Sequence, residues 1–576
     1  MRLSTRRLAL AALLPLALAA RPAAGPGALP PIVFVSRNPP PAAAGAIPGL
    51  GPGARTLAPG GRLLLRARDG TVRELLPPGA LWDVSDPCIA PDGRRVAFAG
   101  TAAPESAWCI WVAALDRADL LAGLARVTRP AAIPGAAPKS RHPDDVDPCW
   151  VDDSTLCFAS TRYPQLDQYG GDPVSNLFLM RLPDGEPIRI TAERNGAEEP
   201  AMDFRRGRIL FARWWHNRYM PADEPPGLTT DPARTSRADT VNLWHAMEVR
   251  PDGSDEQLAC GAPATRLSAM AYQPAVLADG SIAAVYAANP GLSPRSGAAG
   301  IQRFAPRGAA GRRLAGAIAG DGGARAGYGS PGGLAPASAC APAGLPDGRV
   351  LFAYDPGGRG DFGLYVMRAD GTELARVLDL PGTLELDPAP LVAGPRGLRV
   401  TALPRRRAPE LPCTTLEQAL RIPDTFRFLD LNVFESPADR ALPAGPAPVP
   451  GARIRFYATL AREGTAGGDT VALVREAAVG LDGRVDESGL PAGLPMFEQI
   501  VDRDGHVLRG ARGAALMVTH GVAHRVTHGA IPGSAPAAAH VAGLNAGSPG
   551  GTTRCIGCHV GHSTLLRRDL RGAAAR

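Results

Sequence analysis

Apolar and polar residues alternate along most of the chain in short runs separated by turns, many of which contain Asp-Gly. Six related stretches stand out: "DPCIAPDGRRVAFAG" from Asp86, "DPCWVDDSTLCFAST" from Asp147, "EPAMDFRRGRILFAR" from Glu199, "QPAVLADGSIAAVYA" from Gln273, "APAGLPDGRVLFAYD" from Ala341 and "DPAPLVA" from Asp387. In most of them a first residue and a proline precede a short apolar stretch, a turn and a second apolar strand. The pattern predicts a β-hairpin that is used about six times.

Several of these units continue with a second strand pair, as in "NLFLMRLPDGEPIRIT" and "GLYVMRADGTELARVL". Four antiparallel strands that recur every 46 to 74 residues are typical of the blades of a β-propeller. The early runs "PIVFVSRN" and "GRLLLRARDGTVRELL" lack a leading partner, and the unit at Asp387 lacks outer strands. We therefore expect these pieces to share one blade that closes the ring. The alternative is a row of unrelated hairpins or a sandwich.

The propeller rhythm stops at about Arg405, where "FRFLDLNVFES", "ARIRFYATLA" and a longer run with Asp-Gly at 482–483 and 504–505 begin. These alternating strands predict a smaller β-sandwich-like domain. The expected fold class is all-β: about six propeller blades, then the sandwich, then a C-terminal haem-binding segment. The expected divisions are 1–20 signal peptide, 21–405 propeller, 406–425 linker, 426–545 sandwich-like domain and 546–576 haem attachment segment.

The first residues have the pattern of a secretory signal peptide. Arg2, Arg6 and Arg7 precede an apolar run from Leu8 to Ala20, which small residues follow. A run of this length is short for a membrane span, so we expect cleavage and export. The remaining sequence has no long apolar stretch. These features predict a periplasmic protein without a transmembrane segment after signal removal.

The formal charge of +7 is spread over 576 residues, and Lys139 is the single lysine. No basic face with interleaved aromatic residues is apparent, so we expect no nucleic-acid partner. Seven of the nine cysteines are scattered, at 88, 109, 149, 157, 260, 340 and 413. An exported protein can oxidise some of them, but the sequence does not indicate which cysteines pair.

The chemistry of the chain is concentrated near its C-terminus, in Cys555-Ile-Gly-Cys558-His559. This spacing allows two thiols to add to the vinyl groups of one haem while the adjacent imidazole binds the iron. The alternatives are a zinc site, which would want a second Cys-x-x-Cys, and a redox dithiol, which does not need the histidine. We expect one covalent haem c held by Cys555 and Cys558, with His559 as an iron ligand.

The other face of the iron needs a ligand from elsewhere in the chain. Only seventeen residues follow His559 and none is methionine, so this is not an ordinary cytochrome c domain. Seven of the ten histidines fall at or after His506. The candidates for the second axial ligand, or for an additional metal ion such as zinc, are His520, His524, His528, His540 and His562. Any single one of them can equally be a solvent-facing polar residue.

Acidic residues precede the repeated prolines in "DVSDP" (83–87) and "DDVDP" (144–148). We expect them before the first strand of a blade, close to the propeller axis. There they would either ring a cation or cap turns through their own backbone, and turn capping is the more common role of such residues.

The six-unit repeat, the run "GLDGRVDESGLPAGLPMFEQIVDRDGHVLRG" and the terminal "CIGCH" together resemble the hydrazine synthase alpha-subunit family. The resemblance covers most of the chain after the signal. It implies a propeller beside a haem-bearing C-terminal domain, and a subunit that joins others in making hydrazine from nitric oxide and ammonia. In that family the subunit has two haems, the catalytic haem takes a tyrosine ligand shortly after its motif, and the motif histidine binds zinc. Here there is one motif, and "VGHSTLLRRDL" after it contains no tyrosine, so the reaction stays open.

Three functions remain after this reading. The first is a mono-haem protein that transfers electrons, with the propeller as a docking surface. The second is a haem enzyme that acts on a small nitrogen or oxygen species within a multi-subunit complex. The third is a binding or scaffold protein with a structural haem. The expected partners are a redox protein or the subunits of a complex, and a small-molecule ligand is a further candidate.

Overall fold

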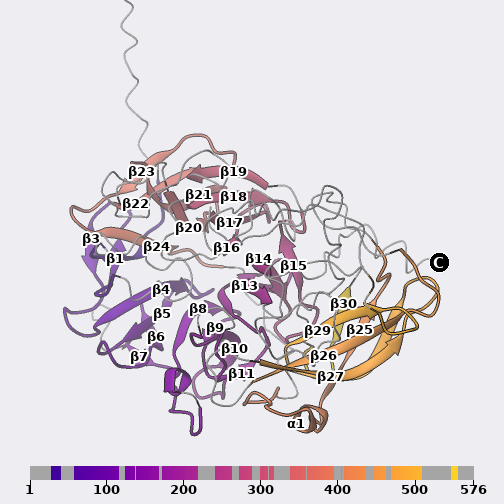
Figure 1. The fold of residues 1–576 in the computed structure, drawn as a ribbon. Helices are drawn as coiled ribbons and strands as arrows, with labels where there is room; N and C mark the ends of the chain where they lie inside the picture. Colours follow the sequence, from indigo (N-terminus) through magenta and orange to yellow (C-terminus); the bar gives the residue numbers. More distant parts are fainter. Residues whose placement is uncertain are drawn as a thin grey trace, which may run out of the picture.

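The computed structural model shows why the repeats pair as they do, because six four-stranded antiparallel sheets surround a common centre (Figure 1). The residues that the structure describes are 28–39, 58–115, 123–136, 138–167, 171–217, 241–261, 271–287, 299–308, 311–316, 338–357, 360–394, 404, 408–435, 447–461, 469–506, 508 and 547–555. The expected all-β propeller fold is confirmed.

We number the blades by chain order and call the last one the closing blade. Blade 1 contains β4 (Asp83–Ile89), β5 (Arg95–Thr101), β6 (Cys109–Ala114) and β7 (Ala125–Arg126). Blade 2 contains β8 (Asp145–Trp150), β9 (Thr155–Ser160), β10 (Asn176–Arg181) and β11 (Ile188–Arg189). Blade 3 contains β12 (Ala197–Asp203), β13 (Arg208–Asn217), β14 (Val241–Val249) and β15 (Gln257–Cys260).

The other three blades repeat the same order of strands. Blade 4 contains β16 (Ala271–Val276), β17 (Ile282–Ala287), β18 (Ala299–Phe304) and β19 (Gly311–Gly316). Blade 5 contains β20 (Ser338–Gly344), β21 (Arg349–Asp355), β22 (Gly363–Arg368) and β23 (Ala375–Leu378). The closing blade contains β24 (Leu384–Pro390), β1 (Ile32–Arg37), β2 (Arg62–Arg66) and β3 (Val72–Glu74), in that spatial order.

The ring closes as the sequence predicts. The late strand β24 pairs antiparallel with the early strand β1, with Ser36 opposite Glu385. The innermost strands β4, β8, β12, β16, β20 and β24 are each in contact with the next, and β24 is again in contact with β4. Because each sheet covers the apolar face of its neighbour, no blade is left with an open face.

Aromatic residues fill the space between neighbouring blades. Trp214 and Trp244 of blade 3 stack with their ring centroids 5.6 Å apart. Trp244 and Tyr272 of blade 4 make a T-shaped contact with their ring centroids 5.0 Å apart. All three side chains are buried. Burial of one such side chain stabilises the fold by about 1.5–3 kcal/mol, so these contacts hold blades 3 and 4 together.

The strands after the propeller form two three-stranded sheets that share one core. One sheet has the order β28 (Val485–Pro491), β25 (Thr425–Asp430), β30 (Thr552–Cys555), and the other β27 (Asp469–Ala478), β26 (Arg453–Ala461), β29 (Met496–Val501). Phe428 and Phe456 meet between them with their centroids 5.1 Å apart. A short helix, α1 (Leu416–Leu420), precedes the sheets, with a capping box formed by Thr415 and Gln418.

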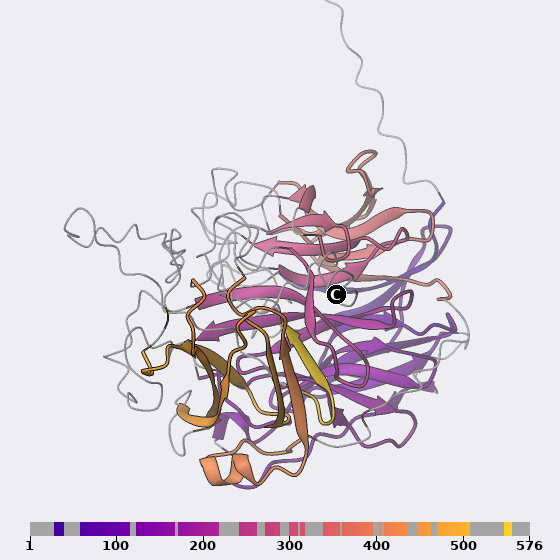
Figure 2. The same cartoon turned by 90° about the vertical axis from the view of Figure 1, so that its right-hand side faces the viewer.

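The two small sheets lie beside the propeller, near blades 2 and 3 (Figures 1 and 2). Arg189 of β11 spans this boundary, because its Nη2 donates to the backbone oxygens of Pro409 and Gly493, both at 2.8 Å. Its guanidinium also lies over the ring of Tyr163, 3.8 Å from the centroid. Of the helices in the described residues, none has the length and apolarity that a bilayer crossing needs.

Candidate functional site

The Cys555-Ile-Gly-Cys558-His559 motif begins in β30, which lies at the edge of its sheet among the described strands. β30 runs parallel to β25, and Cys555 lies opposite Asp430 at the last position of the pairing. Only the backbone of Cys555 belongs to the described residues, and Cys558 and His559 lie outside them. So do His520, His524, His528, His540 and His562, and residues 1–20 of the expected signal peptide. The structure therefore describes where the motif begins, whereas the side chains that would hold a cofactor lie outside the described residues.

Backbone contacts hold the segment before Cys555 against the start of β25. The amide of Gly493 donates to the oxygen of Gly547 at 2.8 Å, and the amide of Gly550 donates to the oxygen of Thr425 at 2.8 Å. A Cβ atom at Gly547 would lie 1.8 Å from the ring of Phe426, so only glycine fits this close approach. These contacts fix where the chain enters β30.

A charged contact also joins β30 to the propeller. Arg554 Nη1 lies 3.1 Å from Asp255 Oδ1, and Asp255 belongs to the turn between β14 and β15 of blade 3. The same carboxylate forms ion pairs with Arg208 at 2.5 Å and with Arg250 at 3.3 Å. Burial opposes ionisation of Asp255, but hydrogen bonding to Arg208 and the charges of the three arginines lower its pKa. The residue next to Cys555 is thus held by a charged group of blade 3.

Blade 3 has a cluster of buried ionisable side chains next to this contact. Arg213 of β13 lies 3.8 Å from Glu193 and 4.0 Å from Glu256, the residue that follows Asp255. Its Nη2 lies 3.3 Å from His245 Nδ1, and because a guanidinium can only donate, Nδ1 is the acceptor. Burial and the nearby carboxylate of Glu256 raise the pKa of Glu193 well above its usual range. The sequence offered no signal for this cluster, since its members are scattered over 64 positions, from 193 to 256.

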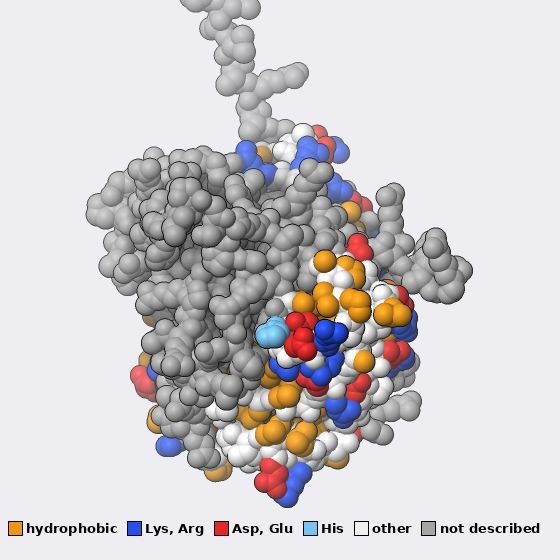
Figure 3. Space-filling model, turned by 45° about the vertical axis from the view of Figure 1, so that its right-hand side comes forward, with side chains coloured by type: hydrophobic (Ala, Val, Ile, Leu, Met, Phe, Trp, Pro, Cys, Tyr) orange, Lys and Arg blue, Asp and Glu red, His pale blue; other side chains and the backbone are white. Residues whose placement is uncertain are grey.

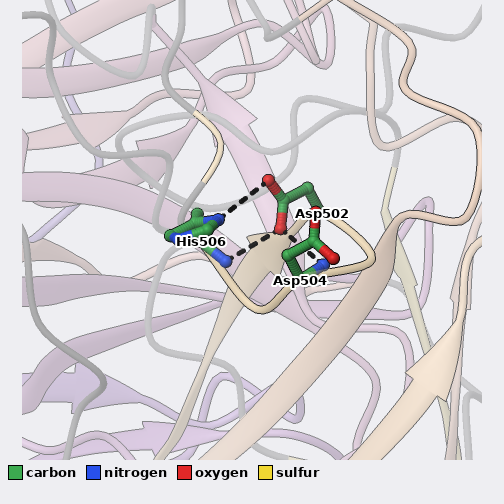
Figure 4. A group of neighbouring side chains, drawn as sticks. All are labelled: Asp502, Asp504 and His506. Atoms are coloured by element: carbon green, nitrogen blue, oxygen red, sulfur yellow. Dashed lines mark hydrogen bonds and ion pairs between the residues drawn. The ribbon is translucent and has the colours of Figure 1, made fainter.

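One histidine of the C-terminal region is described, and it lies in an exposed turn with two carboxylates (Figure 4). Asp502 Oδ1 accepts hydrogen bonds from the amides of Asp504 and His506 at 2.8 and 2.9 Å. His506 Nδ1 lies 3.3 Å from Asp502 Oδ2. The Asp502 carboxylate therefore stabilises the turn after β29, as aspartates at turns commonly do. Around these sheets, acidic and basic side chains are interspersed on the described surface (Figure 3).

The centre of the propeller contains a cavity of about 500 Å³. Each innermost strand contributes a residue with positive φ, followed by proline, and these residues are Asp86, Asp147, Glu199, Gln273, Ala341 and Asp387, with φ between 46° and 56°. In every case the strand pairing shifts register there. The repeated residue-proline pair of the sequence is therefore a β-bulge at the cavity wall.

The bulge side chains connect one blade to the next. Asp147 Oδ2 accepts a hydrogen bond from the amide of Glu199 at 3.2 Å, and Gln273 Oε1 accepts one from the amide of Ala341 at 2.8 Å. Carboxylate oxygens of Asp86, Asp147 and Glu199 lie within 4.8 Å of one another. The hydrogen bonds to the backbone of the next blade give Asp147 and Gln273 a structural role in the ring.

The expected placement of the acidic residues needs one correction. The sequence analysis placed "DVSDP" and "DDVDP" before the first strand of a blade, but these residues lie largely within β4 and β8. Asp83 and Asp145, at the strand starts, bind Arg37 at 3.4 Å and Arg162 at 2.5 Å. Only Asp86 and Asp147 reach the cavity. The difference arises because the bulge lets the strand continue through the proline.

Comparisons with known proteins agree with the fold. No protein-family model and no curated protein matches the chain. The solved structure of hydrazine synthase from Kuenenia stuttgartiensis is similar over 93% of this chain and 69% of its own, with a TM-score of 0.59 and 16% identity. TolB from Acinetobacter baumannii overlaps with 62% of this chain and 66% of its own, at 14% identity and a TM-score of 0.37. At such identity the first similarity establishes the fold alone.

Proposed function

We propose that the chain is an exported protein that carries one covalent haem c on Cys555 and Cys558, with His559 as an iron ligand, and transfers electrons. The observation that carries the proposal is the position of the motif. It starts where β30 ends at the edge of a sheet, and the residue before it is held by Asp255 of the propeller. A haem attached there would supply one-electron transfer.

The chain's own residues fit the attachment of this group. Two thiols two residues apart and an adjacent imidazole are the donor set that covalent haem requires. Cys555 is the last described residue of β30, so the motif starts at the end of the described strand pairing. Arg554 is fixed through Asp255 at 3.1 Å, which would limit the motion of the haem relative to blade 3.

The buried charges of blade 3 support a redox role. A haem that gains or loses an electron changes the local charge, and titratable groups nearby compensate such a change. Arg213, His245 and Glu256 of blade 3 form such a group with Glu193, which lies between β11 and β12. The propeller would present this blade to a redox partner or to the other subunits of a complex.

The fold similarity to hydrazine synthase supports a relation to the hydrazine synthase alpha-subunit family. An overlap of 93% of the chain is too large to be confined to the propeller. Electron transfer is preferred over hydrazine chemistry because no tyrosine follows the motif. The second iron ligand would come from His520, His524, His528, His540 or His562, and the same histidines are the candidates for an additional zinc ion.

The test is expression of the full chain in a bacterium that matures c-type cytochromes, with export to the periplasm. Intact-mass analysis should show one added haem and a processed N-terminus. The double variant Cys555→Ala, Cys558→Ala should lack the haem, whereas Cys413→Ala, in the linker, should retain it. A wild-type chain without covalent haem would overturn the proposal.

An absorption spectrum of the reduced protein tests the electron-transfer role. Six-coordinate, low-spin iron that does not bind carbon monoxide is expected when two histidines hold the metal. Ready binding of carbon monoxide would contradict an electron-transfer haem whose iron is held by two histidines, and it would favour a haem enzyme.

A further inference from the structure

Cysteines occupy one repeated position of the propeller in two adjacent blades only. Two residues after each bulge residue the chain has Cys88 and Cys149 in blades 1 and 2, and alanine in the other four, at 201, 275, 343 and 389. All six positions line the axial cavity. Since the blades repeat, the two cysteines hold equivalent places on neighbouring strands of the ring.

Cys88 and Cys149 lie on adjacent strands of the ring, because β4 and β8 are neighbours among the innermost strands and are in contact. Each thiol lies close enough to the other to shift its pKa. Around them, Trp150 Nε1 donates to the backbone oxygen of Cys88 at 3.2 Å, which holds the strand of Cys149 against that of Cys88. Both residues are free cysteines in this structure.

We propose that Cys88 and Cys149 form a disulfide that links blades 1 and 2 at the wall of the axial cavity. With a small-molecule disulfide such as oxidised glutathione as the oxidant, one thiolate attacks it and releases the first reduced glutathione. The other thiol then attacks the mixed disulfide and releases the second. The two cysteines lose two protons and two electrons, and the oxidant gains them.

The surroundings indicate which thiol reacts first. Cys88 is half-buried at the cavity, whereas Cys149 is buried. Cys149 lowers the pKa of Cys88 in spite of burial, and the same interaction together with burial raises the pKa of Cys149. Because Cys88 is the more accessible of the two, it is the attacking thiolate, and Cys149 resolves the mixed disulfide.

A third cysteine, Cys157, is an alternative disulfide partner for Cys149. Cys157 lies opposite Cys149 in the β8–β9 pair, and it is fully buried. Burial raises its pKa far above that of an ordinary thiol, and the oxidant has no open path to it. We expect Cys157 to stay reduced.

The experiment uses the purified full chain, with or without haem, because these cysteines are remote in sequence from the motif and the inference does not depend on the proposed function. The chain is oxidised with glutathione disulfide, alkylated, and mapped by mass spectrometry without reduction. A Cys88–Cys149 linked peptide with a mass about 2 Da below the sum of its parts is expected. Reduction should separate the two peptides.

Three variants make the test decisive. Cys157→Ala should retain the link, and Cys88→Ala and Cys149→Ala should each abolish it. The oxidised wild type should also unfold at a higher temperature than its reduced form, a difference that Cys88→Ala removes. A Cys149–Cys157 link, two alkylated thiols at 88 and 149 after oxidation, or a persistent glutathione adduct on Cys88 would each overturn the proposal.

Discussion

At the scale of single residues, positive φ values at the cavity wall shape the propeller centre. Five of the six bulge residues are not small, yet all adopt a backbone conformation that favours glycine. The conformation persists because the side chains gain partners there, as when Asp147 accepts from the amide of Glu199. The strain is thus compensated by hydrogen bonds between blades, which a glycine could not make.

Glu385 is the residue whose environment predicts a pH dependence. Its carboxylate is buried where β24 closes the ring, and it accepts from Thr383 Oγ1 at 2.8 Å and the amide of Leu380 at 3.0 Å. Burial, which outweighs these hydrogen bonds, and the charges of Asp379 and Asp361 raise the pKa of Glu385 to about 7.

A carboxyl group with a raised pKa in the folded state favours folding when it is protonated. The free energy of unfolding should therefore fall as pH rises from about 4.5 to about 7, by about 3 kcal/mol, and then become level as far as Glu385 is concerned. Urea denaturation at pH 5 and pH 7.5 measures the difference. The variant Glu385→Gln, which stays uncharged, should show a smaller one. An unchanged pH dependence in that variant would refute the assignment to Glu385.

At the scale of elements, β30 is a short strand whose position depends on contacts outside its own sheet. Among the described strands it pairs only with β25, and the Arg554 contact with Asp255 also holds it in place. Asp255 has a φ of 57°, which asparagine also tolerates. Asp255→Asn therefore removes the charge without altering the backbone preference.

We expect Asp255→Asn to lower the free energy of unfolding by about 1–2 kcal/mol, because Arg208, Arg250 and Arg554 lose a shared carboxylate. The variant should also increase hydrogen exchange in residues 552–555. Asp504→Asn, whose aspartate lies in the exposed turn of Figure 4, is the matched control and should leave both unchanged. Equal exchange in the two variants would show that Asp255 does not hold β30.

At the scale of the whole molecule, the propeller and the two small sheets are joined by a buried arginine. Arg189 donates to backbone oxygens of the linker and of the small sheets, at Pro409 and Gly493. Burial lowers the pKa of Arg189, but the residue remains charged at neutral pH. A cavity of about 310 Å³ lies beside it, at the same boundary.

Arg189→Met should loosen this boundary, because it leaves the two carbonyl oxygens without their donor at a cost of about 1–3 kcal/mol. Calorimetry should show two separated transitions where the wild type shows more cooperative unfolding, and the linker should be cut faster by protease. Arg376→Met, on the exposed face of blade 5, serves as the control. A single transition in both variants would mean that other contacts dominate the boundary.

The sequence predicted the propeller correctly in those features that depend on local pattern. Alternation over five to seven residues and turns such as Asp92-Gly93 predict strands and hairpins, and the missing partner of the first strands predicted the pairing of β1 with β24. Asp86 and Asp147 were predicted to precede the first strand of a blade, but they lie within that strand. The prediction was wrong because a bulge that continues a strand through proline leaves no local signal in the sequence.

By itself, the sequence determined the class of fold, a count of about six blades and the presence of Cys555-x-x-Cys558-His559, because strand alternation, turns and ligand spacing are properties of neighbouring residues. Only the tertiary structure decided that Cys88 and Cys149 lie on adjacent innermost strands, that Arg554 binds Asp255 across 299 positions of sequence, and that Arg189 joins the propeller to the small sheets. These contacts arise when the ring closes and the two sheets pack beside it. Pairing between distant residues depends on the relative placement of whole elements, which no short stretch of sequence specifies.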